Sequence, residues 1–282
     1  MSDAATGSSM ECEQLEVVSH AQGEVLARVN VALQAGRLTA IVGPNGAGKS
    51  TLMACLVGLN RPRSGGVRFK ARRLAQWRAP ELAQHLAFMA QDTQVAFGFT
   101  SREVVEMGRY PHRHCPHAQE AALVQAAMHS TGVGHLAERE VATLSGGERS
   151  RVHMARVLAQ VATALPDGSA HWLLLDEPTA ALDLQHQHAC MQLLRQRAAQ
   201  GLGVVAVLHD LNLALRYAHD VLVVPGGGQA ALYGPSREVL SPACIERVWR
   251  MRGELLHMQD GVPQYAFGAQ TALCSGAGVA YT

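Results

Sequence analysis

One stretch of nine residues constrains this chain more than any other. Residues 43–51 read GPNGAGKST and fit the P-loop pattern G-x-x-x-x-G-K-[ST]. Residues 38–42 (LTAIV) have the character of a short buried strand, and apolar residues recur at helical spacing after the loop. A strand, a glycine-rich turn and a helix start together let backbone N–H groups surround phosphate oxygens. The alternative is a glycine-rich turn that matches the P-loop pattern by chance, but chance does not explain why a strand precedes the turn and a helix follows it.

The pattern assigns roles within the loop. We expect Lys49 to reach the β- and γ-phosphates of a nucleotide and the hydroxyl of Ser50 to bind Mg²⁺. The predicted nucleotide-binding residues of the loop are Gly43, Pro44, Asn45, Gly46, Ala47, Gly48, Lys49, Ser50 and Thr51.

Composition narrows the class of protein. A chain of 282 residues suggests one large domain or two small ones. The net charge of +1, from 24 basic and 23 acidic residues, gives no argument for a nucleic-acid partner. The six cysteines contain no C-x-x-C and read as reduced thiols of a cytosolic protein. Neither a signal-peptide pattern nor an apolar run near 18 residues occurs, so we expect any membrane role to come through a partner.

Two further stretches point to phosphate chemistry. Residues 145–148 (SGGE) form a capping-box helix start, and the two glycines would let the backbone approach an anion such as phosphate. The run 171–177 (HWLLLDE) reads as a buried strand that ends in two carboxylates, where ligand sites of α/β sheets lie. We expect Asp176 to join the Mg²⁺ shell and Glu177 to orient or deprotonate a water, the alternative being two solvated acids. His209 also ends a buried strand and is a candidate γ-phosphate contact, although a lone histidine there is usually structural.

These stretches together resemble the ATP-binding cassette (ABC) ATPases over residues 15–265. The motifs in family order are Walker A at 43–51, the Q-loop Gln91, the signature LSGGE at 144–148, Walker B ending at Glu177, the D-loop at 180–183 and the switch His209. The resemblance implies ATP and Mg²⁺ as cofactors, with Glu177 as the catalytic base, His209 on the γ-phosphate and Gln91 in the Mg²⁺ and water shell. It also implies a head-to-tail homodimer, in which ATP lies between one P-loop and Ser145, Gly146, Gly147 and Asp183 of the other chain.

The implied fold is α/β, a P-loop NTPase with a RecA-like core, a mixed sheet and an inserted helical subdomain. We expect a disordered N-terminus at 1–11, an ATPase domain at 12–267 and a tail at 268–282. Within the domain, the core would span 12–92 and 160–240, the helical subdomain about 93–159 and a C-terminal extension 241–267. The pattern predicts strands at 15–18, 25–33, 86–91, 203–209 and 221–224, hairpins within 61–77 and 255–267, a turn region at 226–234 and a helix at 241–250.

The chain is most similar to the ATPase subunits of hemin, cobalamin and iron-chelate importers. The run 209–218 (HDLNLALRYA) and the long spacer at 162–170 carry this similarity, and the spacer favours the hemin importers. The resemblance implies two transmembrane permease subunits, a periplasmic hemin-binding protein as an indirect partner, no nucleic acid, and a place on the cytoplasmic face of the inner membrane. Siderophore or cobalamin import, or a cassette acting on ribosomes or DNA, are the alternatives.

Three local features depart from the family or stand outside it. An aromatic residue usually stacks on adenine before the P-loop, but here the region offers only His20. Ser150 replaces the glutamine common after the signature, and we attach no consequence to this. A cluster in the helical lobe could contact a metal or heme, or could simply be a polar loop near membrane subunits: His112, His114, Cys115 and His117.

Overall fold

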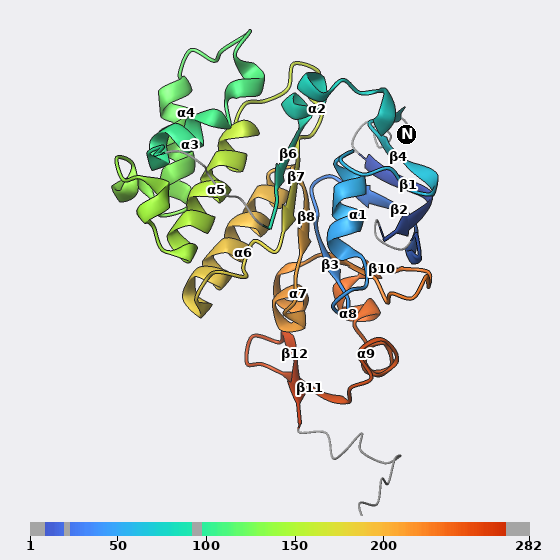
Figure 1. Cartoon of the computed structure of the whole chain (residues 1–282). Helices are drawn as coiled ribbons and strands as arrows, with labels where there is room; N and C mark the ends of the chain where they lie inside the picture. Colours follow the sequence, from blue (N-terminus) through green and yellow to red (C-terminus); the bar gives the residue numbers. More distant parts are fainter. Residues whose placement is uncertain (1–8, 20–22, 92–97, 269–282) are drawn as a thin grey trace, which may run out of the picture.

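A central six-stranded sheet organises the molecule (Figure 1), and the computed structural model describes residues 9–19, 23–91 and 98–268. Its order is β10-β9-β3-β8-β7-β6; β10 runs antiparallel to β9, and the other neighbours are parallel. The expected mixed sheet of an α/β P-loop protein is therefore confirmed. The strands are β3 (Leu38–Val42), β6 (Leu86–Met89), β7 (Trp172–Asp176), β8 (Gly203–Val207), β9 (Asp220–Val223) and β10 (Leu232–Pro235).

The inner strands are buried on both faces, which explains their near-continuous apolar sequences. All five residues of β7 are buried. Leu173 and Leu175 join one hydrophobic cluster, whereas Trp172 and Leu174 join a second cluster on the opposite face.

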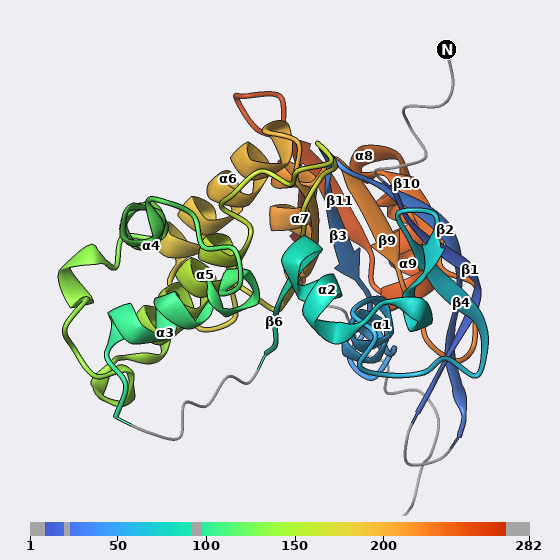
Figure 2. The same cartoon turned by 90° about the horizontal axis from the view of Figure 1, so that it is seen from above.

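An antiparallel sheet covers one face of the central sheet, with helix α1 (Lys49–Leu56) between them (Figure 2). Its order is β2-β1-β4-β5. Because β1 begins at Ser9 and Met10 is fully buried, residues 9–11 belong to the sheet, and the disorder expected for them is wrong. Residues 1–8 lie outside the described residues. The strands are β1 (Ser9–Val18), β2 (Val25–Gln34), β4 (Ser64–Phe69) and β5 (Arg72–Arg73).

Helices cover the other face. The helical lobe consists of α3 (Ser101–Met107), α4 (Glu120–Ser130) and α5 (Gly146–Gln160), drawn green to yellow in Figure 1. Thr100 and Ser145 start α3 and α5 with capping boxes. The remaining helices are α2 (Ala79–His85), α6 (Leu184–Ala199), α7 (Leu211–Tyr217), α8 (Ser236–Val239) and α9 (Pro242–Trp249), with 3-10 turns at Leu74–Gln76, Tyr110–His112, Gly134–Leu136 and Val141–Thr143.

A buried arginine ties the helical lobe together. Arg109, 7% exposed, donates through Nε and Nη2 to both carboxylate oxygens of Glu120, at 2.7 and 3.0 Å. Its Nη1 donates to the carbonyl of Ala159 at 2.7 Å. One side chain thus joins the end of α3, the start of α4 and the end of α5.

The C-terminal part departs from expectation at one point. Residues 226–234 were expected to be a turn region, but Leu232–Pro235 forms edge strand β10 against β9, so that assignment is wrong for its last residues. The three glycines at 226–228 form the turn, whereas the following residues Leu232–Pro235 become a strand because they pair with β9. The predicted terminal hairpin is present as β11 (Gly253–His257) and β12 (Pro263–Phe267). Within the described residues no helix is both long and apolar enough to span a membrane.

Candidate nucleotide site

The P-loop lysine lies folded over its own loop. Lys49 is 6% exposed, and its Nζ donates to the carbonyl oxygens of Gly43 and Pro44, both at 2.9 Å. Burial lowers the pKa of this ammonium group, while the charges of Glu177 and Asp176 oppose the shift. Two neutral carbonyls are weaker partners for a buried cation than a phosphate oxygen is. The ammonium group of Lys49 is therefore available to bind an anion in place of these two carbonyl oxygens.

Gly48 is required by the turn that leads into α1. Its φ is +96°, and a Cβ atom there would come within 2.8 Å of the Cβ of Leu26. A side chain would thus meet both backbone strain and a contact from β2. The glycine allows the helix to start at Lys49, with its N-terminus open to an anion.

Ser50 and Asp176 meet at the mouth of the loop. The hydroxyl of Ser50 donates to Oδ1 of Asp176 at 3.3 Å, and Asp176 is 6% exposed at the end of β7. Burial raises the pKa of this carboxyl group, and the bond from Ser50 opposes that shift. A nearby cation would favour its ionised form. A hydroxyl and a carboxylate oxygen are hard ligands of the kind Mg²⁺ prefers, so the residues fit the expected ion.

Three predicted catalytic side chains converge beside this pair. The amide Nε2 of Gln91 donates to Oε2 of Glu177 at 2.8 Å, and Nε2 of His209 lies 2.5 Å from Oε1. These residues follow β6, β7 and β8, neighbouring parallel strands whose carboxyl ends share one edge of the sheet. The Glu177 side chain is only 12% exposed, so its carboxylate is held in a partly enclosed site.

The backbone at Glu177 was not foreseen from the sequence. Its φ is +54°, in the left-handed region that residues other than glycine seldom occupy. Such a conformation costs on the order of 1–3 kcal/mol and is often found at functional sites. Sequence contains no local signal for it, because Asp176 and Pro178 on either side are compatible with ordinary strand and turn conformations.

The signature residues start α5. The backbone N–H and the hydroxyl of Ser145 donate to Oε2 of Glu148 at 2.9 and 2.8 Å. A Cβ atom on Gly147 would come within 3.1 Å of the carbonyl oxygen of Ala181, so glycine permits the signature to pack closely on the D-loop. The carboxylate of Asp183 caps α6 by accepting from the N–H of His186 at 2.9 Å.

The signature and the P-loop do not meet within one chain. Both views show α5 in the helical lobe on one side of β6–β8 and α1 on the other side (Figures 1 and 2). The structure therefore brings Lys49, Ser50 and Asp176 together with Gln91, Glu177 and His209, whereas α5, the helix that the signature starts, lies across the sheet from α1, the helix that the P-loop starts.

The histidine-rich loop of the helical lobe does not form a metal centre among the described residues. His112 is held by the backbone, since its Nε2 lies 2.8 Å from the carbonyl oxygen of Gln160. His114, Cys115 and His117 are exposed. The described part of the chain contains no group of three or more histidine, cysteine or acidic side chains that could hold a metal. His20, the proposed adenine contact, lies outside the described residues.

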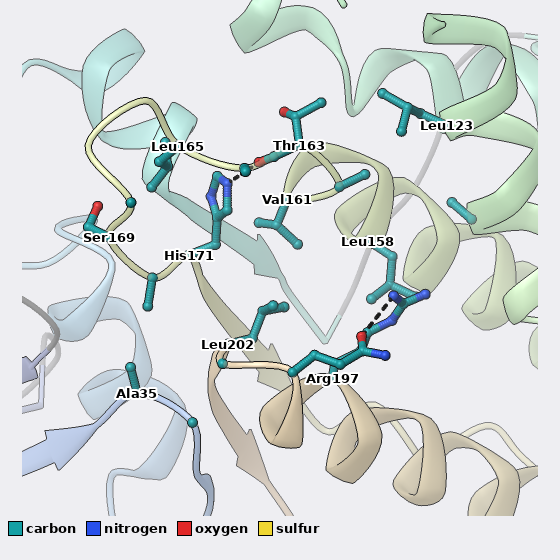
Figure 3. A pocket seen from close by; sticks show the side chains of 18 of the residues that line it. Ala35, Leu123, Leu158, Val161, Thr163, Leu165, Ser169, His171, Arg197 and Leu202 are labelled. Atoms are coloured by element: carbon teal, nitrogen blue, oxygen red, sulfur yellow. Dashed lines mark hydrogen bonds between the residues drawn. The ribbon is translucent and has the colours of Figure 1, made fainter.

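A cavity of about 690 Å³ lies at the opposite, amino-terminal edge of the central sheet (Figure 3). Small and aliphatic residues such as Ala35, Leu158 and Leu202 line much of it. His171 stands in its wall with Nε2 2.5 Å from the carbonyl oxygen of Thr163. None of the predicted site residues borders this cavity.

Comparison with known proteins identifies the family. The sequence profile described as "ABC transporter" matches residues 26–180. The chain belongs to this family. The hemin import ATP-binding protein HmuV of Bradyrhizobium diazoefficiens is 44% identical over 243 residues, covering 86% of this chain and 88% of that protein. HmuV of Gloeobacter violaceus is 48% identical over 223 residues, covering 79% and 80%.

Solved structures agree with the fold of an ABC transporter ATPase. A metal-chelate type ABC transporter in an inward-facing conformation superposes with a TM-score of 0.76 at 24% identity, covering 93% of this chain and 98% of that one. A bacterial Atm1-family ABC exporter with ATP bound gives 0.69 at 25% identity, covering 83% and 40%. At these identities the structures speak for the fold alone.

Proposed function

We propose that this chain is the ATPase subunit that powers hemin import across the inner membrane, with ATP and Mg²⁺ bound at the P-loop. The observation that carries the ATPase role is the Glu177 carboxylate, held between Gln91 and His209 beside Lys49. The hemin cargo rests on relatives named hemin import ATP-binding proteins at 44–48% identity over most of this chain.

The geometry supports a specific division of labour. The backbone of residues 43–51 and the ammonium of Lys49 bind the phosphates. Glu177 accepts the proton of the attacking water, for which its enclosed carboxylate is suited. His209 leaves the carboxylate to donate to the γ-phosphate, and Gln91 orients the water. Ser50, Gln91 and Asp176 would hold Mg²⁺, which when bound neutralises charge on the phosphates.

Pairing of two chains would complete the site. Ser145, Gly146, Gly147 and Asp183 of one copy would face the P-loop of the other, in a head-to-tail homodimer. The separation of these two groups within one chain supports this arrangement. ATP binding would close the pair, and hydrolysis would reopen it, as a shift between two populations. The partners we propose are two permease subunits and, indirectly, a periplasmic hemin-binding protein, with the chain on the cytoplasmic face of the inner membrane and no nucleic acid bound.

Uptake measurements test this function. The gene for this chain is deleted, and the uptake of labelled hemin, a ferric siderophore and cobalamin is compared. Wild type and Glu177→Gln are then restored separately. We expect loss of hemin uptake alone, rescued by the wild type only. Loss of siderophore or cobalamin uptake instead would keep the ATPase role and discard hemin, whereas normal uptake of all three would contradict the proposal.

A further inference from the structure

The C-terminal hairpin packs on the helix that follows the switch histidine. Figure 1 shows β12 directly beneath α7, and the two elements are in close contact. Helix α7 begins at Leu211, two residues after His209. The hairpin can therefore affect the position of His209 at the carboxyl edge of the central sheet through α7, although it contributes no residue to that edge.

One side chain makes the central connection between these elements. The amide of Asn212 donates through Nδ2 to the carbonyl oxygen of Tyr265 at 3.1 Å. Its Oδ1 accepts from the backbone N–H of Tyr265 at 2.7 Å. The side chain thus pairs with β12 as a neighbouring strand would, using both its donor and its acceptor.

The hairpin end of this connection is itself anchored. Tyr265 is 4% exposed, and its hydroxyl donates to the carbonyl oxygen of Leu240 at 2.9 Å. Arg216 of α7 adds an ion pair to Asp260 at 2.7 Å, at the turn of the same hairpin. The side chain of Asn212 is therefore bonded to a part of the hairpin that is itself held in place by the rest of the fold.

The other end leads to His209 through a short segment that is hydrogen-bonded on both sides of this residue. Asp210 caps α7 by accepting from the N–H groups of Asn212 and Leu213, at 2.7 and 3.2 Å. On the strand side, the N–H of Leu208 donates to the carbonyl oxygen of Ile41 at 3.0 Å. The side chain of His209 is 48% exposed, so packing alone does not fix its ring. Apart from its contact with the Glu177 carboxylate, the direction of the ring depends on the backbone at both sides, and the side chain of Asn212 holds the α7 side.

We propose that Asn212 is a positioning residue through which the C-terminal hairpin aims His209 at the reacting phosphate. The inference rests on the role proposed above for His209. Asn212 acts through the backbone of residues 210–212 and does not touch the nucleotide. Its removal should therefore slow turnover without weakening ATP binding, because the P-loop lies on other elements.

A double-mutant cycle on the purified full-length chain tests this, with radiolabelled phosphate release to resolve low rates. We expect Asn212→Ala to lower kcat about tenfold with KM for ATP unchanged, as a small misplacement of a catalytic group does. In a His209→Ala background, the same change should alter kcat by less than about twofold, since residues that act as one unit are not additive. A merely structural role would give the same fractional loss in both backgrounds.

Control variants keep the result interpretable. Arg252→Ala removes the exposed ion pair with Glu246 beside the same hairpin but leaves both the Tyr265 anchor and the Asn212 pairing intact, and kcat should stay within about twofold. Should Asn212→Ala melt below the assay temperature, Asn212→Asp retains the acceptor and loses the donor, and an intermediate kcat is expected. A kcat within twofold of wild type for both Asn212 variants, or an undiminished loss in the His209→Ala background, would overturn the inference alone. Full activity of His209→Ala would remove the proposed role of His209 and this inference with it.

Discussion

The two edges of the central sheet hold histidines in opposite surroundings. At the carboxyl edge, His209 is 48% exposed and lies 2.5 Å from the carboxylate of Glu177. At the amino edge, His171 is 6% exposed and bonds to the backbone carbonyl of Thr163. Burial lowers the pKa of His171, which keeps its ring neutral. The first histidine faces charge and solvent, and the second holds a loop in place.

The edge with the large cavity is therefore not the edge that holds the predicted site residues. The cavity of about 690 Å³ is lined mainly by small and aliphatic residues (Figure 3). The carboxyl edge instead gathers Lys49, Asp176, Glu177 and His209, where parallel strands end together. We therefore expect the reaction where charged side chains converge and not where the cavity lies. We expect changes at the carboxyl edge to alter turnover and changes around the cavity to alter stability.

The largest effect should come from Glu177, the catalytic base that we propose. Glu177→Gln removes the proton acceptor but keeps the size of the side chain. We expect ATPase activity to fall by about 10² to 10⁴, which is the usual contribution of a general base. ATP binding and the melting temperature should stay near their wild-type values. Steady-state phosphate release measures the ATPase activity, equilibrium nucleotide binding measures the affinity for ATP, and thermal denaturation gives the melting temperature. Near-normal turnover would rule out Glu177 as the base.

A large effect on stability should follow from a change near the cavity. Arg109→Met leaves Glu120 and the carbonyl of Ala159 without their shared donor beside residues that line the cavity. We expect the free energy of unfolding to fall by about 3 kcal/mol, as when one partner of a buried ion pair is removed. Urea denaturation measures it. Arg102→Ala, which breaks the exposed pair with Glu138, is the control and should change it by less than about 1 kcal/mol.

A smaller effect is expected from the cavity histidine itself. His171→Ala removes the bond to Thr163 and leaves a void, so we expect a loss of about 2 kcal/mol in unfolding free energy. Turnover per folded molecule should remain within about twofold of wild type. The exposed His135, changed to alanine, serves as the control. A collapse of kcat in His171→Ala without a loss of stability would break the comparison between the edges.

The smallest effect is the contribution of His171 to pH dependence. Because its pKa is below 6.5 in the fold, the unfolded chain binds the extra proton first as pH falls. The stability is fully present above pH 6.5 and is lost as pH decreases toward the folded pKa. The slope from one such group is at most about 1.4 kcal/mol per pH unit. Denaturation curves at pH 8, 7 and 6 should show a shallower fall for His171→Ala; equal slopes would mean that the pKa of His171 is the same in the folded and the unfolded chain.

Much of this architecture was readable from local sequence. The P-loop, the apolar strands and the acids at 176–177 carry their own signals. The structure places the side chains of Gln91 and His209 against Glu177, and the roles of these three residues stay predictions. Three features could not be read locally, because each depends on a distant partner. Strand β10 exists through its pairing with β9, residues 9–11 are ordered by β2 and β4, and Asn212 finds Tyr265 in the hairpin. The polar Asn212 within an otherwise apolar stretch of 211–215 was the one available hint.

The close packing of Gly147 on Ala181 has a consequence for cooperativity. In the proposed pair of chains, the signature would serve the partner's nucleotide, whereas the D-loop adjoins the chain's own Glu177. The signature and the D-loop are joined by the contact between Gly147 and Ala181, which is so close that a methyl group on Gly147 would crowd it. Binding of one nucleotide would then affect the other site through this contact in each chain. The ATPase rate should therefore rise more steeply than linearly with ATP at low ATP concentration. A bulkier residue at 147 would uncouple the two sites and return the response to a simple hyperbola, and it would also raise the ATP concentration required, because Gly147 is itself a proposed nucleotide contact.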